Sequence, residues 1–246
     1  MLNIETAIDV VVDSFSFAYN LNQPCEVRHL NSLKIVKDIP GQSGKMPREE
    51  VFVPVDVTPD EVVALVRAYE PTERHVLSVF QRHGESLDAL NAAYMRYGYQ
   101  HVGYEPLMTI ELPAVFAPEN PPEVLRVRTK EQASLVAKNA RQRLITPEHL
   151  SEPSPVRLYY VEDSGKVVAW GRSIQQRPSV TYVAGMSTNK AHRRRGLGSA
   201  ILSQILSDDA AKGASHSVLA ASPMGEPLYR KCGYEQIGSL HVFEPR

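Results

Sequence analysis

Arg193-Arg194-Arg195-Gly196-Leu197-Gly198-Ser199-Ala200 is the segment that decides the fold, and it lies between a predicted strand and a long predicted helix. The glycines at 196 and 198 let the backbone approach a ligand without a Cβ atom in the way. The first turn of a helix leaves N–H groups unpaired, and the helix dipole adds positive charge there. A pyrophosphate fits such a helix start, and the neighbouring Lys190 and arginines strengthen the positive field.

Two familiar glycine-rich phosphate loops do not match this segment. A dinucleotide-binding fingerprint needs a third glycine at position 201, where Ile201 stands. A P-loop needs Gly-Lys followed by Ser or Thr, which is absent from the segment. The alternative to a ligand site is a solvated basic turn with incidental glycines, and a short glycine motif by itself does not decide between them.

A second informative segment, Pro227-Leu228-Tyr229-Arg230-Lys231-Cys232-Gly233-Tyr234, follows the first by one predicted helix and one predicted strand. An isolated tyrosine on an amphipathic helix is ordinarily a core residue with its hydroxyl in water. The segment gains meaning only in combination with the glycine loop.

Together the two segments resemble the GNAT family, the Gcn5-related N-acetyltransferases. The family's acetyl-CoA loop has the form Arg/Gln-x-x-Gly-x-Gly/Ala, and its C-terminal motif has the form Leu-Tyr-x-x-x-Gly-Phe/Tyr. The matching residues are Arg193, Gly196, Gly198, Leu228, Tyr229, Gly233 and Tyr234. The resemblance covers about Val124 to Phe243 in full element order.

The resemblance implies a mixed α/β fold whose sheet has a V-shaped split between two central strands. Acetyl-CoA is expected in the split, with its pyrophosphate on the backbone N–H groups of about Arg194 to Ser199. The expected cofactor-binding residues are Met186, Ser187, Arg193, Arg194, Arg195, Gly196, Leu197, Gly198, Ser199 and Ser222.

The resemblance also implies direct transfer of an acetyl group from the thioester to an amine. The oxyanion donor is expected to be a backbone N–H between Val183 and Met186, where Gly185 permits an irregular backbone. Tyr229 is the expected catalytic residue, facing the departing thiolate. No general base is assigned, because Thr181 to Thr188 contains no Asp, Glu or His.

Two positions depart from the family pattern, and they keep a second function open. Many members have an Asn and an Ala before the tyrosine, where this chain has Ser222 and Gly225. The first hypothesis is an N-acetyltransferase acting on a primary amine of a small molecule or peptide. The second is a catalytically silent CoA-binding or sensor module.

Hydrophobic periodicity and turn residues predict strands that alternate with helices along the whole chain. The expected helices span residues 4–19, 58–69, 86–97, 129–140, 197–212 and 226–232. The expected strands span residues 51–57, 75–81, 100–112, 124–127, 156–161, 167–174, 180–186, 218–221 and 236–243.

An internal repeat relates the two halves of the chain. At one constant spacing, Tyr94, Gly98, Tyr99 and Gly103 correspond to Tyr229, Gly233, Tyr234 and Gly238. Coincidence is the alternative, because helices commonly end at a glycine. The repeat predicts a tandem in which a smaller, degenerate GNAT-like domain precedes the acetyl-CoA-binding domain.

The N-terminal half is not expected to bind CoA. In place of the glycine loop it has Thr58-Pro59-Asp60-Glu61, where proline removes an N–H and two acids occupy the positive helix end. This half is instead expected to pack on the C-terminal domain and help form the acceptor pocket. The predicted limits are 1–113 for the degenerate domain, 114–122 for a Pro-rich linker and 123–246 for the GNAT domain.

Composition excludes several other classes of protein. The formal net charge of -1 argues against a nucleic-acid binder, and no apolar run approaches the roughly 20 residues of a membrane span. Cys25 and Cys232 form neither a metal motif nor a disulfide framework, which favours the cytoplasm. The expected partner is an amine acceptor, no metal is expected, and the chain is expected to be a monomer or a homodimer.

Overall fold

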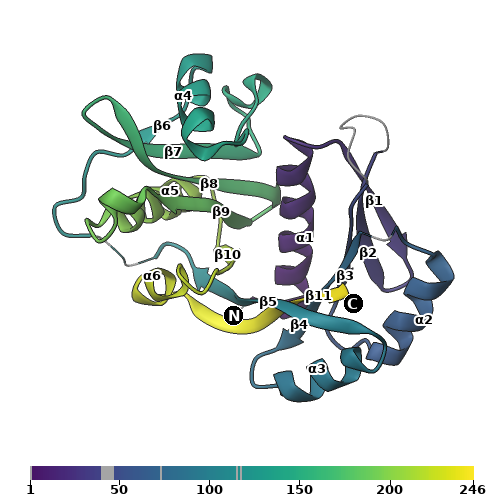
Figure 1. The fold of residues 1–246 in the computed structure, drawn as a ribbon. Coiled ribbons are helices and arrows are strands. Elements are labelled where there is room, and N and C mark those ends of the chain that lie inside the picture. The colour runs from purple at the N-terminus through teal and green to yellow at the C-terminus, as the bar shows by residue number, and fades with distance from the viewer. Residues whose placement is uncertain (1, 40–46, 73, 115, 117) are drawn as a thin grey trace. The chain divides into compact units, whose positions relative to one another are not determined.

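The computed structural model describes residues 2–39, 47–72, 74–114, 116 and 118–246 (Figure 1). Their contacts form two compact units. The C-terminal unit comprises residues 109–219 and 227–235, and the N-terminal unit comprises residues 2–108, 220–226 and 236–246. The last stretch of the chain therefore groups with the N-terminal unit.

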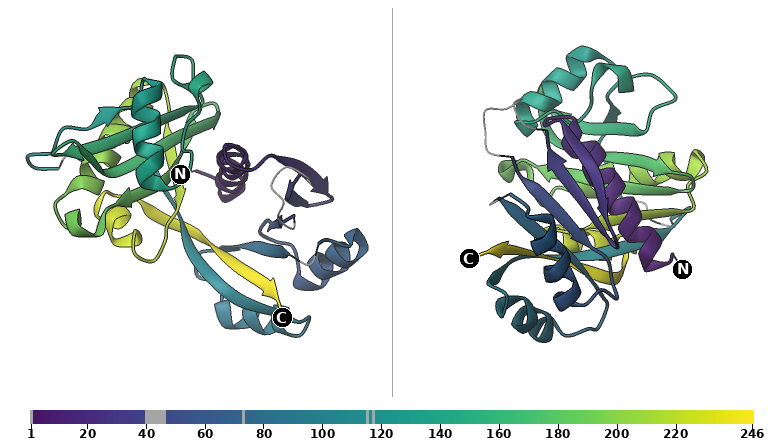
Figure 2. Two further views of the ribbon diagram at one scale, coloured as in Figure 1. Left: turned by 45° about the horizontal axis from the view of Figure 1, so that its top comes forward. Right: turned by 90° about the vertical axis from the view of Figure 1, so that its right-hand side faces the viewer.

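The N-terminal unit is built on a mixed sheet. Its strands follow the order β1 (Cys25–Leu30), β2 (Leu33–Asp38), β3 (Glu49–Val53), β4 (His75–Arg82), β11 (Glu235–Pro245) and β5 (Tyr99–Glu111). The pair β3 and β4 is parallel, while β11 runs antiparallel to β4. Figure 2 shows the last strand, in yellow, running beside β5, in teal.

Three helices accompany this sheet, and each begins at a side-chain cap. They are α1 (Ile4–Asn20) capped by Asn3, α2 (Pro59–Tyr69) capped by Thr58, and α3 (Leu87–Met95) capped by Ser86. The cap residues satisfy N–H groups that would otherwise lack a partner, which is why the helices start where they do. The Asn3 side chain accepts from the Glu5 N–H, and the Thr58 side chain accepts from the Glu61 N–H.

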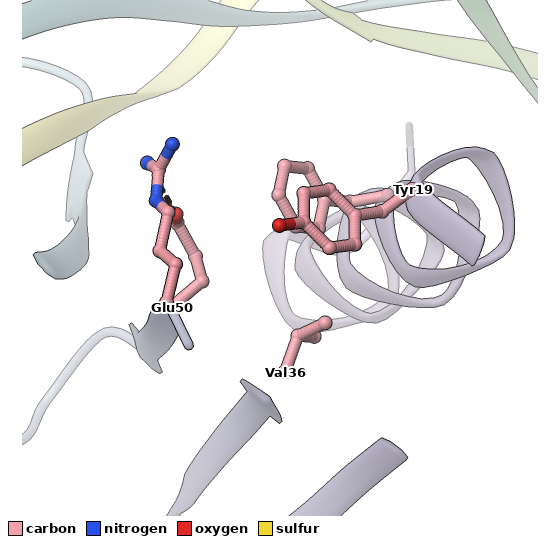
Figure 3. A pocket seen from close by; sticks show the side chains of 5 residues that line it. Tyr19, Val36 and Glu50 are labelled. Atoms are coloured by element: carbon pink, nitrogen blue, oxygen red, sulfur yellow. Dashed lines mark hydrogen bonds and ion pairs between the residues drawn. The ribbon is translucent and has the colours of Figure 1, made fainter. Parts of the chain in front are cut away.

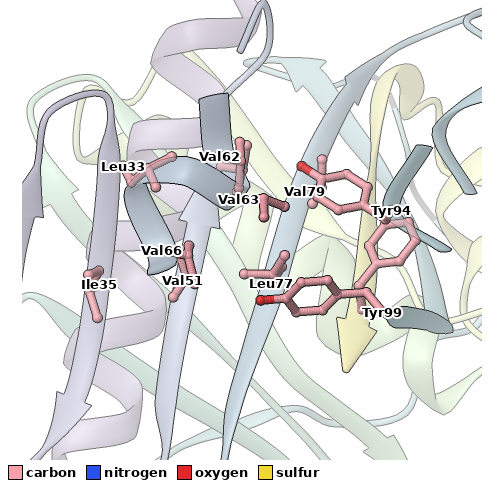
Figure 4. Close-up of a cluster of buried hydrophobic side chains, with 12 residues drawn as sticks. Leu33, Ile35, Val51, Val62, Val63, Val66, Leu77, Val79, Tyr94 and Tyr99 are labelled. Atoms are coloured by element: carbon pink, nitrogen blue, oxygen red, sulfur yellow. The ribbon is translucent and has the colours of Figure 1, made fainter. Parts of the chain in front are cut away.

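The core of the N-terminal unit lies between α2, α3 and the sheet. Val62, Val63 and Val66 of α2 pack against buried residues of β3 and β4 such as Val51 and Leu77 (Figure 4). All five side chains are almost fully removed from solvent. Each buried apolar side chain contributes about 1.5–3 kcal/mol relative to exposure, so this cluster fixes α2 on the sheet.

The strands of the C-terminal unit also run in mixed directions, with a helix on each side. Its strands follow the order β10 (His216–Ala220), β9 (Val180–Thr188), β8 (Lys166–Arg177), β7 (Val156–Asp163) and β6 (Leu125–Arg126). The end of β5 borders β10, where Thr109 Oγ1 donates to the Ser217 carbonyl. Helix α5 (Leu197–Ala211) covers β7, β8 and β9, and α4 (Lys130–Ala140) contacts β8.

The sequence repeat corresponds to the same local structure in both copies. Helix α3 is followed by Gly98 at φ 85°, and α6 (Glu226–Lys231) is followed by Gly233 at φ 94°. Each copy then enters a long strand, β5 or β11. The paired tyrosines pack edge to face in both, with ring centroids 6.2 Å apart for Tyr94 and Tyr99 and 5.8 Å for Tyr229 and Tyr234.

The predicted elements match the structure with two exceptions. The hairpin of β1 and β2 was missed, because β1 is half exposed and shows no clean alternation. The strand predicted over residues 51–57 begins earlier and ends at Val53. The domain limits 1–113, 114–122 and 123–246 stay a prediction, and positions 115 and 117 of the linker lie outside the described residues.

Candidate functional site

Strands β9 and β10 of the C-terminal unit pair only over a short stretch. They are parallel, and among the described residues the ladder runs from His216 and Val180 to Val218 and Tyr182. Strand β9 continues to Thr188, six residues beyond its last paired residue. The outer part of β9 therefore presents backbone N–H and C=O groups that β10 does not occupy.

A bulge interrupts the ladder of β8 and β9 within the part of β9 that β10 does not pair. Trp170 of β8 pairs with Ser187, but Arg172 pairs with Ala184, so two residues of β9 lie opposite the single Gly171. Gly185 has a φ of 62°, a conformation that favours glycine. The irregular backbone expected at Gly185 is confirmed, and such a bulge turns backbone groups away from the regular ladder.

The glycine loop connects the end of β9 to α5 through a left-handed turn. Arg194 has a φ of 64°, and Gly196 has a φ of 76° at the N-cap of the helix. The N–H groups of such a turn point into one concavity, which suits an anion. Gly196 meets no atom within 4 Å of an added Cβ, so its φ rather than crowding requires glycine.

The start of α5 has no side-chain cap. The N–H groups of Leu197, Gly198 and Ser199 belong to the first turn and have no acceptor within the helix. Helices α1, α2, α3 and α4 each have a capping side chain, the last from Thr129. The uncapped start of α5 is thus free to bind an external acceptor such as a phosphate oxygen.

The three arginines of the loop are exposed but do not all point the same way. Arg193 Nε donates to the Thr188 carbonyl at 3.1 Å, which ties the loop to the end of β9. Arg195 Nη1 lies 3.1 Å from Asp163 Oδ2, and this hydrogen bond lowers the pKa of the Asp163 carboxyl. The Asp163 carboxylate offsets part of the positive field expected from the arginines.

Gly198 joins the loop to α6. An ideal Cβ at Gly198 would lie 3.1 Å from Leu228 Cδ2 and 4.0 Å from Thr188 Oγ1. The glycine therefore allows a close approach among the start of α5, the end of β9 and the residue preceding Tyr229. The structure brings together the two segments that the sequence singled out.

Tyr229 is 7% exposed on α6 and packs against Tyr234 with an interplanar angle of 66°. Tyr234 is fully enclosed, and its hydroxyl lies 2.8 Å from Ser217 Oγ of β10. Burial raises the pKa of the Tyr234 phenol well above its ordinary value. Tyr234 thus anchors α6 to β10 and holds Tyr229 in position.

The other predicted cofactor-binding residues, Met186, Ser187 and Ser222, lie in different surroundings. The Met186 side chain lies against Gly171 of β8, where Ile201 of α5 also approaches, so it packs on β8 near α5. Ser187 is exposed at the end of β9. Ser222 groups with the N-terminal unit, and its Oγ accepts from the Gly225 N–H at 3.2 Å. Cofactor contact by these residues stays a prediction.

A buried polar network lies beneath α5 and was not predicted. Arg157 of β7 is 2% exposed and pairs with Asp209 of α5, which is fully buried. Ser173 Oγ of β8 donates to the same carboxylate at 2.8 Å. A polar residue in an apolar strand was the available signal, but its partner lies 52 positions away.

A small cavity in the N-terminal unit carries no comparable chemistry. It is lined by Phe15, Tyr19, Val36, Arg48 and Glu50 (Figure 3). Arg48 and Ser78 both bond the Glu50 carboxylate, and the Tyr19 hydroxyl donates to Asp38 at 2.8 Å. The polar groups of this cavity are therefore engaged with one another.

Three further observations concern the described residues only. No cluster of His, Cys, Asp and Glu within them could hold a metal ion. No helix among them is long and apolar enough to cross a membrane. Cys25 and Cys232 are both free thiols, and burial raises the pKa of Cys232 to about 11.

Comparison with known proteins agrees with this geometry. Residues 154–236 match the family model of the acetyltransferase (GNAT) domain. No curated protein matches the chain. A GCN5-related N-acetyltransferase from Kribbella flavida has a TM-score of 0.69 at 20% identity, and the match covers 100% of this chain and 97% of that chain.

Two other solved structures share the fold. A GCN5-related N-acetyltransferase from Sphaerobacter thermophilus has a TM-score of 0.60 at 18% identity, over 86% of this chain and 76% of that chain. A putative GNAT acetyltransferase from Novosphingobium aromaticivorans has a TM-score of 0.56 at 12% identity, over 99% and 96%. The predicted mixed α/β fold is confirmed, and the match to the GNAT domain model covers residues 154–236.

Proposed function

We propose that this protein, in which residues 154–236 form a GNAT acetyltransferase domain, transfers an acetyl group from acetyl-CoA to a primary amine of a small molecule or peptide. The observation that carries the proposal is the uncapped, left-handed start of α5 beside the end of β9, whose edge toward β10 is unpaired beyond Tyr182. This arrangement provides donors for a diphosphate and an open strand edge for an amide-containing chain.

The loop and the outer part of β9 bind different parts of acetyl-CoA. The N–H groups from Arg194 to Ser199 bind the pyrophosphate, and Arg194 adds charge from an exposed side chain. The outer part of β9, including Met186 and Ser187, bonds the amides of the pantetheine arm through its backbone. Gly198 keeps the path along α6 clear of a side chain.

The chemistry requires an oxyanion donor and a partner for the departing thiolate. The bulge at Gly185 offers a backbone N–H for the oxyanion that develops on the thioester carbonyl. Tyr229 donates a hydrogen bond to the thiolate. A phenol is ordinarily a weaker acid than a thiol, so full proton transfer to the thiolate is uphill and hydrogen bonding is the larger effect.

A second candidate function follows from the absence of a general base on β9. Strand β9 has no Asp, Glu or His from Val180 to Thr188, so an attacking ammonium must lose its proton to water or to a group elsewhere. A chain that binds acetyl-CoA without turnover is a CoA-binding or sensor module. Turnover with amines separates the two functions.

Calorimetric titration of acetyl-CoA into the wild type, Gly198→Glu and Gly198→Gln tests the binding site. The two variants add similar bulk beside Leu228, but only the glutamate adds negative charge where the pyrophosphate binds. We expect one site per chain, weaker binding by Gly198→Gln and the weakest by Gly198→Glu. Absence of binding by the wild type would refute both functions.

Release of free thiol with a panel of amines tests the chemistry. We expect turnover by the wild type and at least a tenfold lower kcat for Tyr229→Phe, with acetyl-CoA affinity nearly unchanged. Tyr94→Phe, at the corresponding position of the repeat, serves as the matched control and keeps full turnover. Binding without turnover across the panel would favour the sensor function.

A further inference from the structure

Arg172 of β8 is a buried guanidinium with an unoccupied donor. The side chain is 6% exposed, and its Nη1 donates to the Leu144 carbonyl at 2.9 Å. The Nε atom is buried and has no hydrogen-bond partner. Burial lowers the pKa of Arg172 to about 10, so the group still carries its charge at neutral pH.

A second buried arginine on the neighbouring strand has the partner that Arg172 lacks. Arg157 is 2% exposed and pairs with the Asp209 carboxylate. For Arg172, no carboxylate of the described residues lies within ion-pair distance. A buried charge without a counter-ion is costly, so its retention points to an anion supplied from outside the chain.

The position of Arg172 places that anion beside the proposed reaction centre. Arg172 pairs with Ala184 across the ladder, and an ideal Cβ at Gly185 would lie 3.8 Å from Arg172 Nε. Gly185 is exposed and is the bulge residue that offers the oxyanion donor. A ligand group at Arg172 Nε is therefore only a few bonds from an amine that attacks the thioester.

Arg172 and helix α5 lie on opposite faces of the sheet. Ser173 and Gly171 face α5, since Ser173 bonds Asp209 and Gly171 lies against Ile201. Arg172 points to the opposite side, where Leu144 follows α4. The uncapped start of α5 and the guanidinium of Arg172 thus belong to different faces, so one can bind the CoA diphosphate while the other binds a second anion.

We propose that Arg172 binds a carboxylate of the acceptor, so that the amine substrate is an amino acid or a similar amine with a nearby carboxylate. This inference rests on the proposed acetyltransferase function. Nη1 is engaged by Leu144, which leaves the edge formed by Nε and Nη2 for a planar, bidentate acceptor. The guanidinium orients the acceptor and takes no part in bond making, so Arg172 is a specificity residue.

The kinetic test compares amino acids with their carboxamides as acceptors. We expect the wild type to favour the carboxylate by at least about 30-fold in kcat/KM, as is typical of a hydrogen-bonded charge pair. Arg172→Met should reduce this preference to within about threefold, chiefly through KM, and Arg172→Lys should retain part of it. Arg126→Met, which removes an arginine paired with Glu152, is the control and should keep the preference.

A thermal-shift test does not depend on turnover. Because Arg172 is buried without a counter-ion, Arg172→Met should melt above the wild type in the absence of ligand. Amino acids, but not their carboxamides, should raise the melting temperature of the wild type and leave that of Arg172→Met unchanged. Acetyl-CoA affinity, measured by calorimetry, should be the same in both proteins.

The outcomes separate this inference from the proposed function. Absence of acetyl-CoA binding refutes the proposed function, while the thermal-shift comparison still tests Arg172. Equal effects of carboxylates and carboxamides on the wild type overturn the inference, even where amines are acetylated. A preference for phosphate-bearing amines over carboxylates overturns it in favour of a different anion.

Discussion

The starts of α5 and α2 are two solutions to the same local problem. Both helices link parallel strands, β9 to β10 and β3 to β4. Helix α2 satisfies its first turn internally, since Thr58 Oγ1 accepts from the Glu61 N–H at 3.3 Å and Pro59 has no N–H. Helix α5 begins at left-handed Gly196 with no capping side chain. The start of α2 has a capping side chain, whereas the start of α5 leaves its first N–H groups open to the anion proposed above.

The buried faces of the two helices differ as well. Helix α2 buries only valines, whereas α5 buries Asp209 among its apolar residues and holds it through Arg157 and Ser173. The helix that presents open donors to a ligand is thus fixed from beneath by a directional, charged network. The buried residues of α2 are all valines.

The largest expected effect tests this difference in the buried faces. Arg157→Met leaves Asp209 buried without its partner and should lower the free energy of unfolding by about 3–5 kcal/mol. Urea denaturation followed by circular dichroism measures the loss. Val62→Ala on the buried face of α2 should cost only about 2 kcal/mol.

The double variant Arg157→Met, Asp209→Leu distinguishes a lost pair from a lost contact. Replacing both charges with apolar side chains should restore most of the stability, because no unpaired charge is then left behind. A double variant as unstable as Arg157→Met would contradict this account and assign the loss to packing.

A second prediction uses opposite effects at one residue. Ser199→Asp adds a negative charge in the first turn of α5, which stabilises the helix by about 0.3–1 kcal/mol. The same charge should weaken acetyl-CoA binding by at least about tenfold, measured by calorimetry. Ser199→Asn is the neutral control and should bind within about threefold of the wild type. Unchanged affinity in Ser199→Asp would show that the diphosphate binds elsewhere.

The corresponding change in α2 should affect stability alone. Thr58→Ala removes the cap and should cost about 1 kcal/mol in urea denaturation, with acetyl-CoA affinity unchanged. Thr58→Ser keeps a hydroxyl acceptor and should restore most of the loss. A change in acetyl-CoA affinity on removing the Thr58 cap would contradict the proposal that the start of α5, and not that of α2, binds acetyl-CoA.

The extent to which sequence predicted this structure follows the range of each interaction. The caps at Asn3 and Thr58 and the turn at Gly196 involve neighbours in sequence, so residue type and spacing suffice to predict them. The hairpin of β1 and β2 turns at Asn31, whose φ of 51° fits a turn residue, and the alternation of Leu33 and Ile35 was a usable signal.

Pairings between residues far apart in the sequence could not be predicted from residue type and spacing. The Arg157 and Asp209 pair depends on the register of β7 and on the rotation of α5, neither of which the sequence states. That Arg172 has no carboxylate partner among the described residues depends in the same way on the register of β8 with β9. The glycine loop of the site was predictable, whereas the residue proposed to select the acceptor required the fold.

The smallest expected effect compares the two copies of the repeated tyrosine. The Tyr94 hydroxyl is buried without a hydrogen-bond partner, and burial raises the pKa of this phenol well above its ordinary value. Tyr94→Phe removes a desolvated polar group and leaves the ring in contact with Tyr99 and Phe243, so it should raise stability by up to about 1 kcal/mol. Urea denaturation measures the gain, and a loss of stability would mean that the hydroxyl has a partner after all. A gain in stability together with unchanged turnover would show that the N-terminal copy retains the packing role of the tyrosine without the chemistry proposed for Tyr229.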